Sequence, residues 1–163
     1  MRRAAAGLAI AAALLAVAFS PSLGAATRPR SVSAAVRAAT PAQAPFAGLT
    51  TTTVHVGGKA RRVVIAKTEA QRQRGLRQRS DVGPYDGMLF VFPATTNVGF
   101  TMSTVPVSLD IGFYRSDGRR VDTLRMVPCS GTDATCPVYQ TRASFRYTLE
   151  TLPGRLPAGT LTG

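Results

Sequence analysis

The sequence has few of the residues from which metal and catalytic sites are commonly built. It contains one histidine, two cysteines and eight acidic residues among 163 positions. A lone histidine cannot form a usual zinc site without cysteine or acidic partners nearby, and His55 alternates with valines as a residue on the polar side of a strand does. No serine or cysteine nucleophile stands in a recognisable motif. The sequence therefore predicts no metal and no cofactor.

Acidic residues are also too few to offer many carboxylate pairs. Glycoside hydrolysis needs two carboxylates roughly 5–10 Å apart, and Asp110 and Glu150 are the two acids embedded in strand-like patterns. Asp110 stands between Leu109 and Ile111, on the opposite face of a strand from both. Two interpretations remain open: a ligand-binding or acid/base carboxylate, and a structural acceptor for backbone N–H groups or an arginine. We favour the structural one.

Long apolar runs are absent beyond the first 26 residues. A charged start, an apolar segment over 4–19 and small residues at 24–26 predict a secretory signal peptide over 1–26, cleaved after Ala25 or Ala26. The apolar segment is short and weakly hydrophobic for a membrane span. An uncleaved N-terminal anchor is the alternative. We expect a secreted or extracytoplasmic envelope protein.

Residues 27–49 are rich in alanine, proline, serine and arginine, without helical or alternating patterning. Such a composition buries too little apolar surface to offset its ordering entropy. It predicts a disordered tether over 27–49, followed by a single domain over 50–163, long enough for one hydrophobic core.

Positive charge dominates the chain, with a net charge of +12, of which about +7 lies in the domain from residue 50. Arg72, Arg74, Arg77 and Arg79 cluster within eight positions. This cluster is typical of a solvated basic helix face, and contact with an anionic or polysaccharide envelope component is the alternative. Nucleic acid is not expected, because the chain is predicted to be exported and carries no nucleic-acid motif.

The residue pattern of the domain predicts a mainly β fold. Gly57-Gly58-Lys59 joins two β-branched runs as a hairpin does, and Thr68 with Gln71 fits the capping box of a short helix. These signals predict a small β-sandwich or barrel with one short helix packed on it. Strands are expected at 51–56, 62–66, 88–92, 98–104, 107–114, 120–127 and 144–152.

Cys129 and Cys136 are the two cysteines. In an exported domain, a pair this close in sequence is most simply a disulfide. A redox or metal role is the alternative, but the spacing is not Cys-x-x-Cys and further ligands are missing.

Several segments, in order, resemble the family known as Domain of Unknown Function 192. They are Val64–Leu76, Gly87–Phe92, Phe100–Ile111, Pro128–Cys129, Cys136–Tyr139 and Tyr147–Glu150. The resemblance implies an exported, β-rich domain and supplies no catalytic residues. We take four residues of these segments as candidate binding residues: Met102, Thr104, Asp110 and Tyr139.

Two classes of function follow. The first is an exported, non-catalytic module that binds an envelope polysaccharide, peptide or protein partner. The second is a small envelope hydrolase that uses Asp110 as its acid or base. A pocket that contains Asp110 beside Glu150 or His55 would favour the hydrolase, whereas Asp110 held against backbone amides would favour the module.

Overall fold

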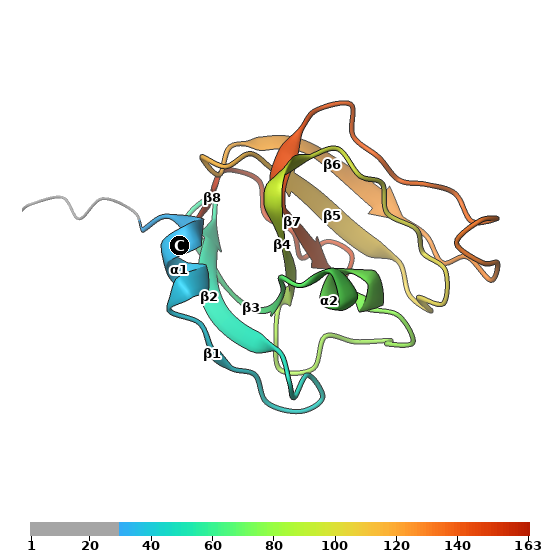
Figure 1. Cartoon of the computed structure of the whole chain (residues 1–163), viewed down its shortest axis with the longest axis horizontal. Coiled ribbons are helices and arrows are strands. Elements are labelled where there is room, and N and C mark those ends of the chain that lie inside the picture. Colours follow the sequence, from blue (N-terminus) through green and yellow to red (C-terminus); the bar gives the residue numbers. More distant parts are fainter. Residues whose placement is uncertain (1–29) are drawn as a thin grey trace, which may run out of the picture.

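The computed structural model describes residues 30–163, which form one mixed β-sheet with two short helices (Figure 1). The strands lie in the order β1-β2-β3-β4-β7-β5-β6, with β8 paired to β2. The prediction of a mainly β domain with a helix packed on it is confirmed. The helices are α1 (Val32–Arg37) and α2 (Glu69–Arg74), and the strands are β1 (Thr40–Pro41), β2 (Thr50–Val56), β3 (Lys59–Ala66), β4 (Gly87–Thr96), β5 (Leu109–Tyr114), β6 (Arg120–Met126), β7 (Phe145–Thr151) and β8 (Leu161–Thr162).

The β2–β3 hairpin forms where the sequence predicts it. Gly57 and Gly58 adopt φ values of 55° and 79°, the left-handed region that a tight two-residue hairpin turn requires. The flanking strands pair antiparallel, with Val56 opposite Lys59. The two-glycine turn therefore sets the register in which β2 pairs with β3.

Helix α2 connects β3 to the parallel strand β4. The predicted capping box is present: the Thr68 hydroxyl accepts a hydrogen bond from the Gln71 amide, and the Gln71 side chain accepts one from the Thr68 amide. Gly75 follows the helix at φ 47°, so the chain can turn back toward the sheet. In Figure 1, α2 lies against the sheet beside β4.

Strands β4, β7 and β5 are the centre of the sheet, and β5, β7 and the first six residues of β4 are covered on both faces. Every residue of β5 is buried, and all but one of β7. One face carries Phe90, Ile111 and Phe145, and the other carries Leu89 and Leu149. Because successive side chains point to opposite faces, the near-continuous burial of these strands means that each face has its own apolar cluster.

One predicted strand is absent. Residues 98–104 form no strand, and they touch neighbouring chain through single bridges of Phe100 with Tyr139 and of Ser103 with Cys129. Thr104 has a φ of 60°, which interrupts an extended backbone. The alternation in this segment instead reflects side chains that turn inward from a loop, such as Met102, which is 1% exposed.

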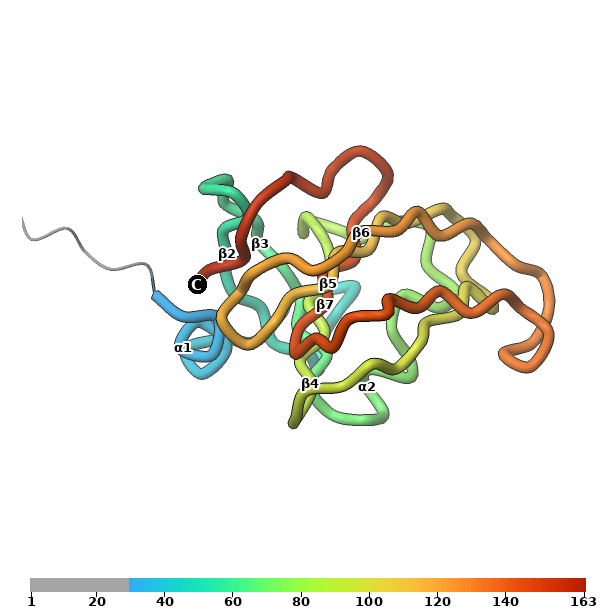
Figure 2. The backbone as a smooth tube through the Cα atoms, turned by 90° about the horizontal axis from the view of Figure 1, so that it is seen from above, coloured from blue at the N-terminus to red at the C-terminus, as the bar shows by residue number. Residues whose placement is uncertain are grey.

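The predicted tether is wrong for residues 30–49. Ser31 caps helix α1, whose Val32 and Ala35 are buried, and Phe46 is part of the core. The Gly163 amide donates to the Arg30 carbonyl oxygen, so the C-terminus lies beside α1 (Figure 2). Tertiary packing thus supplies the burial that the local composition lacks. The predicted signal peptide, at 1–26, lies outside the described residues and stays a prediction.

Candidate functional site

Asp110 lies on β5, opposite Arg125 of β6 and Thr151 of β7. Its carboxylate accepts hydrogen bonds from both the Nε and the Nη2 of Arg125, and from the Gly154 amide at 2.7 Å. The bond to Asp110 raises the pKa of Arg125. An arginine and a backbone amide are the two kinds of partner that the structural interpretation of Asp110 requires.

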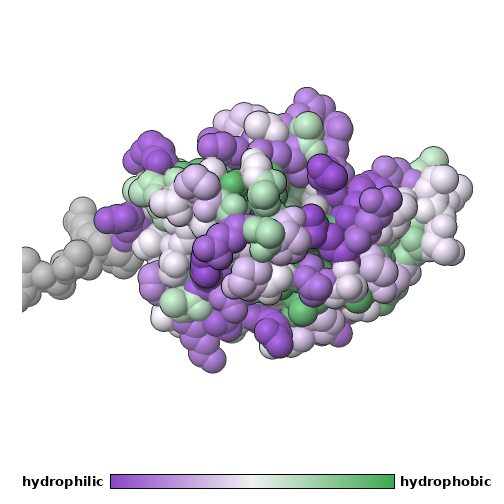
Figure 3. Space-filling view, turned by 90° about the horizontal axis from the view of Figure 1, so that it is seen from below, coloured by the Kyte–Doolittle hydropathy of each residue, from purple (hydrophilic) through white to green (hydrophobic). Residues whose placement is uncertain are grey.

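A pocket of about 640 Å³ opens between α2 and the sheet. Its volume is typical of small-molecule sites. On the face shown in Figure 3, apolar surface appears in small patches among hydrophilic side chains. The inner lining is largely apolar and comes from β4, β5 and the loop between them: Phe90, Phe92, Phe100, Met102, Val105 and Leu109.

Arginines of the predicted basic cluster lie at the mouth of the pocket, and most of them bind protein groups. Arg72 donates to the Val91 carbonyl oxygen at 3.1 Å and lies over the Phe92 ring. Arg77 donates to the Ser103 carbonyl oxygen. Arg74 is exposed and lines the same mouth. The cluster is therefore in part a set of structural contacts.

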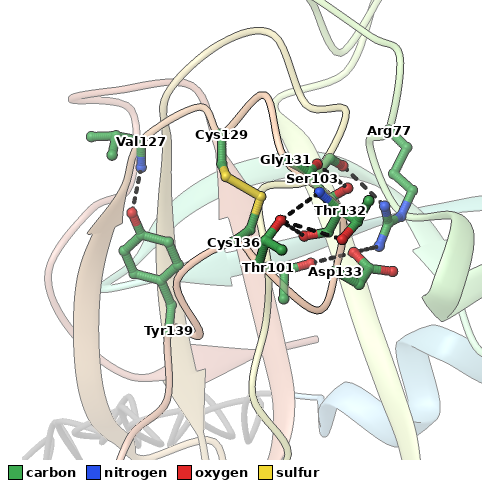
Figure 4. Close-up of a disulfide and its surroundings, with 11 residues drawn as sticks. Arg77, Thr101, Ser103, Val127, Cys129, Gly131, Thr132, Asp133, Cys136 and Tyr139 are labelled. Atoms are coloured by element: carbon green, nitrogen blue, oxygen red, sulfur yellow. Dashed lines mark hydrogen bonds and ion pairs between the residues drawn. A yellow bond between two sulfur atoms is a disulfide. The ribbon is translucent and has the colours of Figure 1, made fainter.

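The predicted disulfide between Cys129 and Cys136 is present. It closes a loop whose Asp133 accepts hydrogen bonds from Arg77 at 2.5 Å and from the Thr101 hydroxyl at 2.8 Å (Figure 4). These bonds, Arg77 first, lower the pKa of Asp133. The disulfide loop thus holds one side of the pocket mouth against the segment that follows α2.

Glu150 of β7 is the acidic group at the inner end of the pocket. It is 5% exposed and lines the cavity. It lies opposite Met88 on one side and Ile111 on the other, both apolar. Burial is the one cause of its altered acidity and raises its pKa to about 8. At neutral pH this carboxyl group is therefore mostly protonated.

The candidate binding residues do not meet at one place. Met102 lines the pocket, but Thr104 and Tyr139 do not. The Thr104 carbonyl oxygen accepts from the Gln78 amide, and the Tyr139 hydroxyl accepts from the Val127 amide at 3.1 Å. Asp110 is also outside the pocket, because it occupies the face of β5 opposite Leu109 and Ile111.

Sequence reasoning missed that Glu150 belongs to the pocket. An alternating pattern predicts Phe145, Tyr147 and Leu149 on one side of the strand and a solvated face for the residues between them. That prediction is wrong: Phe145 packs in the cluster of Phe90, whereas Tyr147 and Leu149 pack in the cluster of Leu89, because the pairing of β4 with β7 shifts its register. Both faces of β7 are covered. The available signal was a carboxylate inside a strand that is otherwise apolar and aromatic.

Two absences hold for the part of the chain that the structure describes. No three His, Cys, Asp or Glu side chains between residues 30 and 163 gather in a way that could hold a metal ion. No helix in that range is both long enough and apolar enough to cross a membrane. The disulfide is compatible with an extracytoplasmic location.

Comparisons with known proteins agree on the fold and supply no activity. A protein of unknown function from Novosphingobium aromaticivorans has 27% sequence identity and a TM-score of 0.62, over 78% of this chain and 95% of its own. A protein from Sinorhizobium meliloti, described as a proposed transcription regulator, has 24% identity and a TM-score of 0.55, over 67% of this chain and 88% of its own, and shows the fold alone. No curated protein matches the chain. The profile of the family described as "Uncharacterized ACR", Domain of Unknown Function 192, matches residues 51–161, and the chain therefore belongs to that family.

Proposed function

We propose that the protein is an exported, non-catalytic module that binds a compact component of the cell envelope in the pocket between α2 and the sheet. The observation that carries this proposal is the pocket itself: a hollow of about 640 Å³ that combines an apolar, aromatic inner wall with polar and charged residues from α2, the end of β4 and the disulfide loop. This combination is typical of ligand sites, where apolar walls supply affinity and a few polar groups set orientation.

Export is supported by two independent features. The N-terminal pattern is that of a signal peptide. The bond between Cys129 and Cys136 is of a kind that persists in oxidising compartments. Together they favour a ligand found outside the cytoplasm.

The pocket favours a peptide side chain or another compact amphipathic group over a polysaccharide. Sugars carry many hydroxyl groups, each of which needs a hydrogen-bond partner when it is buried. The wall formed by Phe90, Phe100 and Met102 offers none. Exposed Arg74, at the mouth, is available to an anionic part of the ligand.

The hydrolase that would use Asp110 finds less support. Asp110 is outside the pocket and is engaged by Arg125 and the Gly154 amide. An acid or base must reach the reacting group directly or through one water molecule. The observed surroundings of Asp110 therefore favour the binding module.

Ligand screening with a pocket-filling variant tests the proposal. Ala94 is exposed and lines the pocket, so Ala94→Trp should obstruct it. Ala60→Trp places the same side chain at an exposed position of β3, outside the pocket, and serves as the control. A panel of small alkyl and aryl fragments, screened by saturation-transfer NMR, should include binders to the parent and to Ala60→Trp that Ala94→Trp loses. A panel without binders, or binders that Ala94→Trp retains, would contradict the proposal.

A further inference from the structure

Glu150 takes part in neither of the two ion pairs that the described residues form. Its neighbours on β4 and β5 are Met88 and Ile111, which carry no hydrogen-bonding hydrogen. A Cβ at Gly87 would lie 2.1 Å from the Glu150 carbonyl oxygen, so the glycine lets β4 approach β7 closely there. Because Glu150 is 5% exposed and lines the pocket, a ligand would reach its carboxyl group through the pocket.

The charged groups that line the same pocket do not fill this role. On the α2 side they are Glu69, Arg72, Arg74 and Arg77, and on the disulfide loop Asp133. None of them contributes to the altered acidity of Glu150, which comes from burial alone. The arginines of the lining therefore form no ion pair with Glu150, and an ionised Glu150 would need a counter-charge from a ligand.

Phe90, Phe92 and Phe100 line the same cavity as Glu150, and the guanidinium group of Arg72 already lies over the Phe92 ring. Phe90 and Phe92 of β4 each lie edge to face with Phe100, with ring centroids 5.6 and 6.4 Å apart. The face of an aromatic ring attracts a cation, and sites for substituted ammonium groups are commonly built from several rings. A cavity that is lined by both a buried carboxyl group and aromatic rings is suited to an organic cation.

We propose that Glu150 is the recognition residue of the pocket and that the ligand inserts an alkylammonium group, from a free amine or from a lysine-like side chain of a peptide. This inference rests on the proposed function and names its ligand class. The ammonium N–H groups donate to the Glu150 carboxylate, and the alkyl stem packs against the apolar wall. Glu150 releases its proton to solvent as the ammonium group binds, so that one buried ion pair replaces one neutral acid.

Calorimetric titration with n-hexylamine and n-hexanol tests this inference. The two probes share the alkyl chain and differ in the charged group. At pH 7, we expect hexylamine to bind at least tenfold more tightly than hexanol. The measured heat of hexylamine binding should change with the ionisation enthalpy of the buffer, with a slope that corresponds to the release of nearly one proton. Nα-acetyl-lysine amide, as a second probe, distinguishes a peptide side chain from a free amine.

Two variants complete the test. Glu150→Gln keeps the shape of the side chain and should lose both the tenfold preference for hexylamine and the proton release, while its circular dichroism spectrum stays that of the parent. Asp117→Asn makes the corresponding acid-to-amide change at an exposed residue outside the pocket and should retain both. Equal binding of the two alkyl probes, no proton release, or an unchanged preference in Glu150→Gln would overturn the inference. If Ala94→Trp still abolished fragment binding, the proposed function would survive that result.

Discussion

Replacing Asp110 with asparagine should destabilise the fold by about 1 kcal/mol. The introduced amide can still accept from the Gly154 N–H group, which Asp110 now binds at 2.7 Å. That bond would change from charge-assisted to neutral, and charge-assisted bonds are roughly twice as strong as neutral ones, so about 1 kcal/mol is lost. The ion pair with Arg125 is also lost, but the Arg125 side chain is 53% exposed, so solvent screens that pair and its loss changes the free energy of unfolding little.

Urea unfolding followed by far-UV circular dichroism measures this change. Asp117→Asn is the control: it removes the same charge from an exposed turn residue that accepts from the Arg119 amide. The control should change the free energy of unfolding by less than about 0.5 kcal/mol. An Asp110→Asn protein as stable as the parent, or more stable, would refute the structural interpretation and indicate that Asp110 belongs to a functional site.

Three further predictions concern Glu150, the disulfide and the N-terminus. The pKa of Glu150 rises from 4.5 in the unfolded chain to about 8 in the fold, so the free energy of unfolding should fall as the pH rises from about 4.5 to 8, by an amount that can reach a few kcal/mol. Glu150→Gln should flatten this decline. An equal decline in the parent and the variant would contradict the pKa assigned to Glu150. Replacing Cys129 and Cys136 with serine should lower the free energy of unfolding by roughly 2–3 kcal/mol, since the bridge closes a loop of about eight residues; thiol titration of the denatured, unreduced parent should find no free thiol. Mass spectrometry of secreted protein should find a mature N-terminus at Ala26 or Thr27, and full-length protein confined to the cytosol would contradict the signal peptide.

Local sequence signals predicted the parts of the fold that depend on neighbours in the chain. The Gly57-Gly58 turn, the Thr68–Gln71 capping box and the bond between two nearby cysteines each depend on residues close in sequence. The sequence did not reveal the contacts between residues that are far apart in the chain. Helix α1 is ordered by contacts of Val32 and its neighbours with distant strands, which the composition of residues 30–49 does not reveal.

The candidate site was predicted less well for the same reason. Asp110 and Glu150 were both recognisable as carboxylates in strands, but the sequence does not say which of them faces a cavity. The register between the strands decides it. Because Glu150 lies opposite Ile111 and Asp110 lies opposite Thr151, Glu150 faces the pocket with Leu109, whereas Asp110 is on the other face with Arg125. The loop at 98–104 supplies Phe100 and Met102 to the pocket from backbone that was expected to be a strand.

The most direct test of this account is a map of backbone amide shifts in ¹⁵N-labelled protein as n-hexylamine is added. The largest changes should appear at Glu150, Gly75 and Thr101, which line the pocket from three different segments of the chain. Changes that centre instead on Arg125 and Gly154, around Asp110, would contradict the account and place the binding site on the opposite face of the sheet.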